Sequence, residues 1–191
     1  MPNLDDFEQA RLEVRDLRGA TPEVEAGLWR YLLDIDLVTE VTAPRRAVDD
    51  PLRWRLSHPR QIRTRAHSDM LWLRPLDLVA LLEGRVYAAR GQLVIDVADP
   101  PDGNHPCDAD LVTGRWCLDA GPDGVVVQRA RPAQTVDVHL GIAELGALFL
   151  GGVTATTLPE AGRVSEGRSG ALGVADRLFA ATPSPLSSTG F

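Results

Sequence analysis

Side chains able to perform nucleophilic catalysis are scattered along this chain of 191 residues. Such catalysis needs a serine or cysteine within hydrogen-bond reach of a histidine that an acidic group orients. The sequence has no Gly-x-Ser-x-Gly turn, and its histidines are far apart: His58, His67, His105 and His139. We therefore expect no nucleophilic centre, and histidines that are exposed or satisfied by hydrogen bonds.

The two cysteines, Cys107 and Cys117, have no second pair and no histidine cluster nearby. A structural zinc site usually takes four Cys or His ligands in closely spaced pairs, so no metal is expected. The two thiols could face each other across a hairpin. In a reducing compartment, free thiols packed as small hydrophobic groups are the favoured interpretation.

Glycine pairs that could hold a phosphate are placed away from helix N-termini. A pyrophosphate-binding turn joins a strand to the start of a helix, where free N–H groups face the anion. The glycines at 121 and 124 join two predicted strands, and those at 151 and 152 follow a predicted helix. The sequence therefore predicts no nucleotide or coenzyme A loop, and no cofactor is expected in this chain.

The charge balance argues against a nucleic-acid partner. The chain carries 27 acidic and 20 basic side chains, a net charge of -7, whereas phosphate backbones are bound by clustered Lys and Arg. Three arginines in 60–65 form either an anion patch, a contact with a partner subunit or a solvated linker. No apolar run is long enough to cross a bilayer and residues 1–10 are unlike a signal peptide, so we expect no membrane and a cytoplasmic protein.

The N-terminal third has the pattern of a β-α-β unit. Thr21-Pro22-Glu23 supplies an N-cap hydroxyl, a proline at the first helical position and an acid in the first turn, which predicts a helix over 22–33. Its core face is expected to hold Val24, Leu28, Tyr31 and Leu32. Flanking strands are expected at 11–17 and 37–42, a short helix after Pro51, and a basic linker over 58–65.

The remaining two thirds predict an α+β layer with helices packed over one face of an antiparallel sheet. The expected strands are 70–74, 92–98, 115–119, 124–129 and 135–140, and the expected helices are 75–84, 142–150, 157–161 and 171–181. Trp29 and Trp72 lie in apolar stretches and are predicted core residues. A sheet lined by Leu, Ile, Val and Trp also suits a lipid-binding cavity, so a packed core and a cavity both stay open.

Several blocks of sequence, in order along the chain, resemble the enhanced intracellular survival (Eis-type) family of GNAT N-acetyltransferases. The blocks are 21–22 (TP), 28–34 (LWRYLLD), 49–54 (DDPLRW), 71–77 (LWLRPLD), 145–152 (LGALFLGG), 161–164 (AGRV) and 175–179 (ADRLF). The resemblance implies two acetyltransferase-like folds followed by a sterol carrier protein 2-like domain, assembled as a hexamer. Here residues 1–65 would be the end of the second, non-catalytic acetyltransferase-like fold, and residues 66–191 the sterol carrier protein 2-like domain.

The same resemblance assigns a role to the end of the chain. In that family the C-terminal carboxylate, typically on a phenylalanine, takes a proton from the substrate amine, and Phe191 stands in that position. The preceding residues 188–190 (STG) lack the acidic neighbour that relatives offer to a polyamine. The acetyl-CoA site belongs to a first fold that has no counterpart here, so the chain would need that domain or a partner chain.

Three functional interpretations follow from these expectations. The first is the C-terminal region of an Eis-like N-acetyltransferase, inactive alone and part of a homo-oligomer, which contributes the terminal carboxylate and an assembly surface. The second is a stand-alone sterol-carrier-like module that binds a lipid or another apolar small molecule. The third is a module that serves assembly alone.

Overall fold

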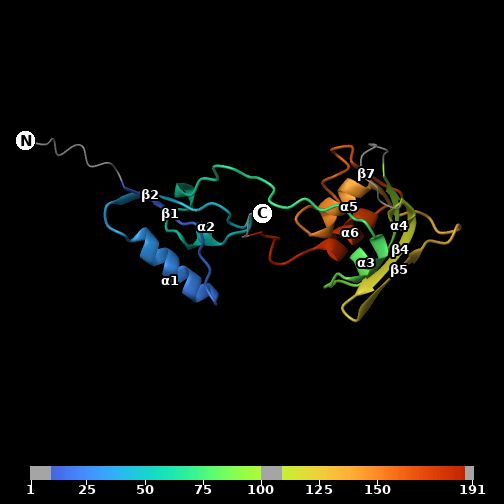
Figure 1. The fold of residues 1–191 in the computed structure, drawn as a ribbon, viewed down its shortest axis with the longest axis horizontal. Coiled ribbons are helices and arrows are strands. Elements are labelled where there is room, and N and C mark those ends of the chain that lie inside the picture. Colours follow the sequence, from blue (N-terminus) through green and yellow to red (C-terminus); the bar gives the residue numbers. More distant parts are fainter. Residues whose placement is uncertain (1–9, 100–108, 188–191) are drawn as a thin grey trace, which may run out of the picture. The chain divides into compact units, whose positions relative to one another are not determined.

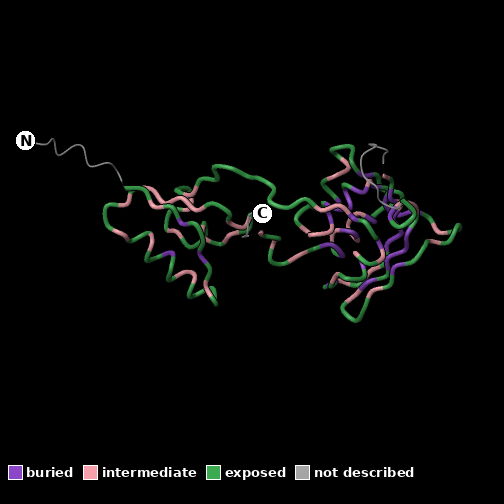
Figure 2. Tube along the Cα trace, in the orientation of Figure 1, coloured by how far each residue is buried: buried purple, intermediate pink, exposed green. Residues whose placement is uncertain are grey.

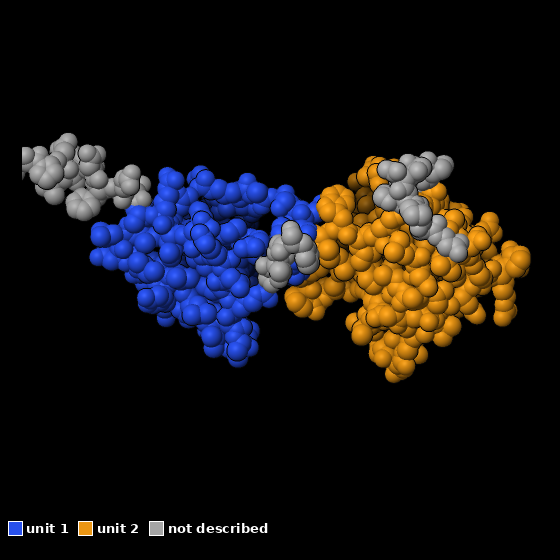
Figure 3. Space-filling view, in the orientation of Figure 1, with its two compact units in different colours: residues 1–70, 186–191 blue, residues 71–185 orange. Residues whose placement is uncertain are grey.

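The chain forms two compact units. The computed structural model describes residues 10–99 and 109–187. Unit 1 consists of Met1–Met70 with Leu186–Phe191, and unit 2 of Leu71–Pro185 (Figure 3). Within the described ranges, no helix is both long and apolar enough to cross a membrane.

Unit 1 contains the expected β-α-β arrangement. Strands β1 (Ala10–Glu13) and β2 (Val38–Thr42) pair in parallel, with Leu12 opposite Val41. The helix α1 (Pro22–Leu33) makes the crossover that two parallel strands require. The short helices α2 (Leu52–Arg55) and η2 (Pro59–Gln61) follow. The first strand ends four residues earlier than predicted, although the Val14 amide still donates to Thr42 O.

Local sequence explains where α1 begins. The Thr21 hydroxyl accepts a hydrogen bond from the Val24 amide at 3.3 Å, and Pro22 occupies a position whose N–H would be unsatisfied. Glu23 and Glu25 place negative charge near the positive end of the helix. The predicted bounds of this helix are confirmed.

The predicted core face of α1 is wrong for three of its four residues, and Leu32 is partly buried against the core of unit 1. Trp29 is the buried side chain of the helix, whereas Val24, Leu28 and Tyr31 are 49%, 40% and 71% exposed. The two-stranded sheet is narrow and covers only the strip of helix around Trp29. Three apolar side chains one helical turn apart are therefore left without cover.

Unit 2 is built on a five-stranded sheet in the order β5-β4-β3-β6-β7. The strands are β3 (Gly91–Ala98), β4 (Gly114–Gly121), β5 (Gly124–Arg129), β6 (Val138–Gly141) and β7 (Val164–Glu166). Neighbours are antiparallel except β3 and β6, which run parallel with Ile95 opposite Val138. The sheet is therefore mixed, because a loop carries the chain from the edge strand β5 back past β4 to the far side of β3. The short strand β7 was not predicted.

The helices of unit 2 gather on one side of this sheet, which confirms the α+β class (Figure 1). They are α3 (Leu78–Glu83), α4 (Ala109–Val112), α5 (Ile142–Phe149) and α6 (Ala171–Phe179). Leu82, Leu118 and Leu145 have no exposed area and belong to the core of this unit. Figure 2 shows buried positions on several strands and helices of unit 2. Trp116 joins this core, and the Cys117 thiol is buried and free, as predicted, whereas Cys107 lies outside the described residues.

Other expectations for unit 2 were wrong. Residues 70–74 form no strand and Trp72 is 85% exposed, because the segment finds no partner strand and ends at Pro75. The next helix begins at Leu78, where the Asp77 carboxylate caps the Ala80 amide at 2.9 Å. Residues 157–161 form turns, which Gly162 continues with a positive φ of 69°.

Candidate functional site

Phe191, whose carboxylate the resemblance singles out, lies outside the described residues. The chain that leads to it is described as far as residue 187, and its root is the end of α6. The site is therefore built from the groups that surround this root.

Arg85 lies at the point where the tail leaves α6. Its Nη1 donates to Phe149 O at 2.6 Å, and its Nη2 donates to Phe179 O at 2.8 Å and to Ala180 O at 3.1 Å. The guanidinium carbon also lies 5.4 Å from the ring centroids of Tyr87 and Phe179. One cation thus joins the C-terminal ends of α5 and α6, where helix dipoles favour positive charge.

Burial changes the acidity of both groups at this root. It lowers the pKa of Arg85 from its ordinary value, while the neighbouring Tyr87 opposes that shift. Burial raises the pKa of Tyr87 to about 12, and its hydroxyl donates to Leu82 O at 3.0 Å. Arginine stays protonated in proteins, so at neutral pH both groups hold structure and transfer no proton.

A second group of polar side chains lies in an open hollow of about 440 Å³ along β3, β6 and β7. His139 Nδ1 lies 3.3 Å from Asp96 Oδ2, since the parallel register sets these residues opposite each other. This contact favours the tautomer whose Nε2 is a free acceptor. Ser165 is opposite His139 on β7, but among the described residues no hydrogen bond joins them.

An ion pair lies beside this hollow, which Arg163 and Gly141 line. Arg163 Nε donates to Glu144 Oε1 at 2.6 Å, and the other carboxylate oxygen accepts from the Gly141 amide at 3.1 Å. The start of α5 is thus occupied by the protein's own carboxylate.

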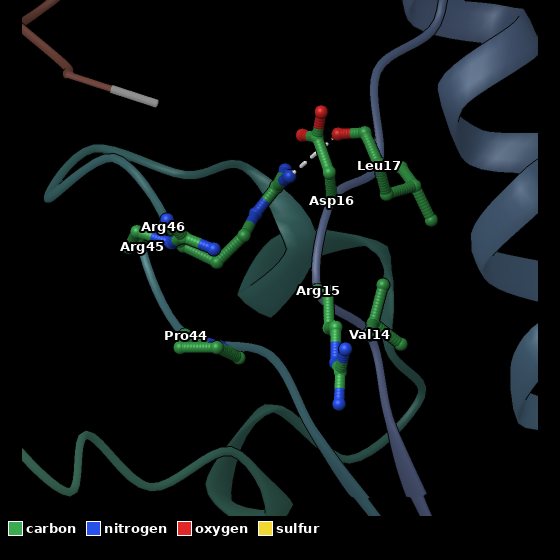
Figure 4. A pocket seen from close by; sticks show the side chains of 7 residues that line it. All are labelled: Val14, Arg15, Asp16, Leu17, Pro44, Arg45 and Arg46. Atoms are coloured by element: carbon green, nitrogen blue, oxygen red, sulfur yellow. Dashed lines mark hydrogen bonds between the residues drawn. The ribbon is translucent and has the colours of Figure 1, made fainter. Parts of the chain in front are cut away.

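Unit 1 has a much smaller hollow (Figure 4). It is lined by Val14, Arg15, Asp16, Leu17, Pro44, Arg45 and Arg46, and its volume of about 10 Å³ suits a single water. Arg46 donates to Leu17 O at 2.8 Å, to Asp50 at 2.5 Å and to Glu25 at 2.6 Å. Burial disfavours its charge, but the bonds to Asp50 and Glu25 outweigh burial and raise the pKa of Arg46.

The N-terminus of α1 does not fit a pyrophosphate. Its first turn carries the carboxylates of Glu23 and Glu25, and the Thr21 hydroxyl already accepts from the Val24 amide. Hydrogen bonding with Thr21 lowers the pKa of Glu23, so this carboxylate is ionised at neutral pH and repels an anion.

Sequence reasoning missed Arg85 and the Asp96–His139 pair. Arg85 bonds carbonyls 64 and 94 positions along the chain, a separation that carries no local signal. The Asp96–His139 pair depends on the parallel pairing of β3 with β6, whereas antiparallel neighbours were expected. The sequence did predict the two strands that carry these residues, from the alternation of side chains in β3 and from the run that forms β6. It did not predict the register between the strands, which brings Asp96 and His139 together.

Two family models match the chain. The model described as acetyltransferase (GNAT) domain matches residues 3–75, and the model described as sterol carrier protein domain matches residues 78–187. The second match covers more than half of the chain.

The similar proteins are described as N-acetyltransferases. An uncharacterized N-acetyltransferase of Streptomyces avermitilis is 40% identical over 177 residues, which cover 93% of this chain and 40% of the relative. N-acetyltransferase Eis of Mycobacterium tuberculosis is 33% identical over 173 residues, which cover 87% of this chain and 38% of that protein. The crystal structure of Eis1 from Mycobacterium abscessus superposes with a TM-score of 0.81 at 30% identity, over 98% of this chain and 45% of that one.

The chain spans about two fifths of the length of the curated relatives it matches. A GCN5-related N-acetyltransferase from Kribbella flavida shares the fold, with a TM-score of 0.64 at 22% identity. With its sterol carrier protein domain, its GNAT match and these relatives, the chain belongs to the Eis-type family of GNAT N-acetyltransferases.

Proposed function

We propose that this chain is the C-terminal region of an Eis-like N-acetyltransferase that transfers the acetyl group of acetyl-CoA to an amine. In this proposal it contributes the terminal carboxylate of Phe191 and an assembly surface in a cytoplasmic homo-oligomer, and is inactive alone. The observation that carries the proposal is the exposed apolar stripe on α1 of unit 1, in a chain whose relatives are N-acetyltransferases.

Unit 1 has features of a fold that another polypeptide segment completes. Parallel strands are normally buried on both faces within larger sheets, yet the sheet of β1 and β2 has two strands. Its helix α1 carries the uncovered apolar side chains Val24, Leu28 and Tyr31 at spacings of four and three. This spacing forms one stripe along a helix, which supports a further acetyltransferase-like segment packed against it.

GNAT acetyltransferases use acetyl-CoA as cosubstrate. The acidic first turn of α1 repels the pyrophosphate of this molecule, so the N-terminus of this helix does not fit it. In our proposal a separate catalytic domain binds acetyl-CoA, and no step of the transfer runs through the residues of unit 1.

The part assigned to this chain is proton transfer at the tail. An α-carboxyl group has an ordinary pKa of about 3.3 to 3.7, so it is ionised at neutral pH and can accept a proton. The Phe191 carboxylate would take a proton from the substrate amine and leave the nitrogen lone pair free to attack the acetyl carbonyl.

The alternative, a lipid carrier, has less support. Side chains such as Leu78, Leu118 and Leu145 fill the space between the sheet and its helices and have no exposed area. Both hollows described above lie elsewhere. A lipid would have to displace packed core side chains.

A chimera tests the proposed function. The chain replaces the matching 177 residues of the Streptomyces avermitilis relative, and acetyl transfer from acetyl-CoA to an aminoglycoside is measured. We expect turnover by the chimera and none by the chain alone. A chimera that folds without turnover, or turnover by the isolated chain, would refute the proposal.

A matched variant tests the carboxylate. Adding one glycine after Phe191 keeps a terminal carboxylate but moves it by about 3.5 Å. Misplacing a catalytic group by an ångström can lower a rate by about 100-fold, so we expect a loss of that order in kcat with an unchanged KM for acetyl-CoA. An unchanged kcat would remove Phe191 from the mechanism.

A further inference from the structure

We propose that Arg85 is a positioning residue for the C-terminal tail, which it binds together with Gly151 and Gly152 so that the tail leaves unit 2 in one direction. The inference rests on the proposed function, because it concerns the carboxylate that the tail carries. Arg85 would act through the tail and contact no substrate.

The hydrogen bonds of Arg85 connect the root of the tail to a neighbouring helix. Its Nη2 bonds the last carbonyl of α6, at Phe179, and that of Ala180 beyond the helix, while Nη1 bonds the last carbonyl of α5, at Phe149. A charged donor strengthens such bonds, and the planar guanidinium serves two directions at once. Bending the tail away from α5 would break at least one of them.

Two glycines show how closely the tail follows the end of α5. Gly151 has a positive φ of 79°, and a Cβ there would collide with Phe179 O and lie 2.7 Å from Ala181 Cβ. A Cβ at Gly152 would lie 3.1 Å from Pro185 Cγ. The tail therefore lies against this turn from Ala181 to Pro185, along a path that larger residues would block.

The Nε of Arg85 indicates that this arrangement is not optimised for stability alone. It is buried and, within the described residues, has no hydrogen-bond partner. An unsatisfied buried donor costs about 1–3 kcal/mol, which a simpler apolar contact would avoid. The guanidinium instead links the ends of α5 and α6 to the first residue of the tail, Ala180.

The length of chain beyond the anchor links Arg85 to the proposed catalysis. With the tail held through Pro185, the segment Leu186–Phe191 spans at most about 20 Å from its anchor. With the anchor moved back to Ala180, the segment beyond it grows from six to eleven residues and its greatest reach to about 40 Å. Effective concentration falls as the −3/2 power of tether length, so release lowers that of the Phe191 carboxylate about 2.5-fold.

The test compares two arginines with similar surroundings in the full chain. Arg85→Gln removes the anchor, while Arg129→Gln is the matched control, since Arg129 also donates to a carbonyl, Thr113 O at 2.6 Å, and lies over an aromatic ring, Trp116. Backbone order parameters from NMR relaxation are measured at the amides of Ala181, Thr182 and Ser184. We expect values near 0.85 in the wild type and the control, and below about 0.6 in Arg85→Gln.

Tail amides that stay rigid in Arg85→Gln, or that are already mobile in the wild type, would overturn the proposal. If Arg85→Gln does not fold, Arg85→Lys replaces it, because lysine keeps the charge but cannot bridge both helix ends. In the chimera, Arg85→Gln should also lower kcat about 2.5-fold with an unchanged KM for acetyl-CoA. An inactive chimera sinks the proposed function and leaves the NMR result on the anchor intact.

Discussion

The two units of this chain bury their apolar side chains to very different degrees. In unit 1 the buried cluster consists of Val14, Leu17 and Trp29, beneath a sheet of two strands. In unit 2 the helices and a five-stranded sheet enclose a continuous core of Leu, Ile, Val, Tyr, Phe and Trp side chains. Because the free energy of folding scales with apolar area removed from water, unit 2 has the means to be stable alone and unit 1 has little.

The difference also separates two uses of apolar residues. Unit 2 places its large side chains inside, whereas unit 1 leaves the stripe of Val24, Leu28 and Tyr31 on α1 uncovered. An exposed stripe at helical spacing is typical of a surface that packs against another segment. The comparison therefore predicts that core substitutions in unit 2 act on stability and stripe substitutions in unit 1 act on assembly.

The largest effect is expected from Leu82→Ala in unit 2. Leu82 has no exposed area, so the substitution removes buried methyl groups and leaves a cavity, at a cost of about 2–5 kcal/mol in the free energy of unfolding. Urea unfolding followed by the NMR signals of β3 measures this cost. Leu111→Ala is the control in the same unit, because Leu111 is exposed, and it should cost less than about 0.5 kcal/mol. Equal effects of the two variants would contradict a packed core.

Gly151→Ala should have the next largest effect, about 3 kcal/mol on unit 2. The positive φ is unfavourable for alanine, and the added Cβ collides with the Phe179 carbonyl. Gly162→Ala separates the two causes, since Gly162 also has a positive φ but nothing within 4 Å of the added atom. The control should lose about 1 kcal/mol by thermal unfolding, and a loss equal to that of Gly151→Ala would remove the argument from close approach.

The elements predicted correctly from the sequence are those whose ends are determined by residues next to them in the chain. The helix α1 begins where Thr21 and Pro22 require it, and α5 ends just before the glycines at 151 and 152, which were expected to follow a helix. The predictions that failed concern strands whose pairing depends on residues far away in the sequence. Residues 70–74 are apolar like a buried strand but pair with no strand in the described part of the chain. Strand β6 pairs in parallel with β3, although Val138 lies 43 residues beyond its partner Ile95.

The surroundings of the candidate site were less predictable than the fold. Nothing near Arg85 in sequence indicates that its guanidinium reaches Phe149 and Phe179, since that contact exists only once α5 and α6 end side by side. The apolar stripe of α1 was visible as a pattern, but periodicity cannot tell a face that packs within the chain from one that awaits a partner. The role proposed for the Phe191 carboxylate comes from the family resemblance, because residue patterns alone assign it no role.

Alkaline pH should weaken unit 2 by about 2–3 kcal/mol. The pKa of Tyr87 rises from about 10 in the unfolded chain to about 12 in the folded one, so its contribution is complete below pH 10 and is lost as the pH rises to 12. The basic side chains are all arginine, so no lysine titrates in this window. Tyr87→Phe should remove the dependence in urea unfolding between pH 9 and 12, while Tyr31→Phe, at an exposed tyrosine, should keep it. If the free energy of unfolding of Tyr87→Phe still falls with pH in this range, groups other than Tyr87 cause the dependence.

The smallest effect on stability, below about 0.5 kcal/mol, is expected from Leu28→Ser on the stripe of α1. Leu28 is already partly hydrated in this chain, so the serine changes little in urea unfolding. In the chimera with the Streptomyces avermitilis relative the same side chain is expected to be covered, and its loss should lower the unfolding temperature by several degrees. Arg30→Ser, at an exposed position off the stripe, should leave both proteins unchanged. If Leu28→Ser affects chain and chimera equally, the stripe has no partner, and unit 1 would have to be regarded as complete despite its small core.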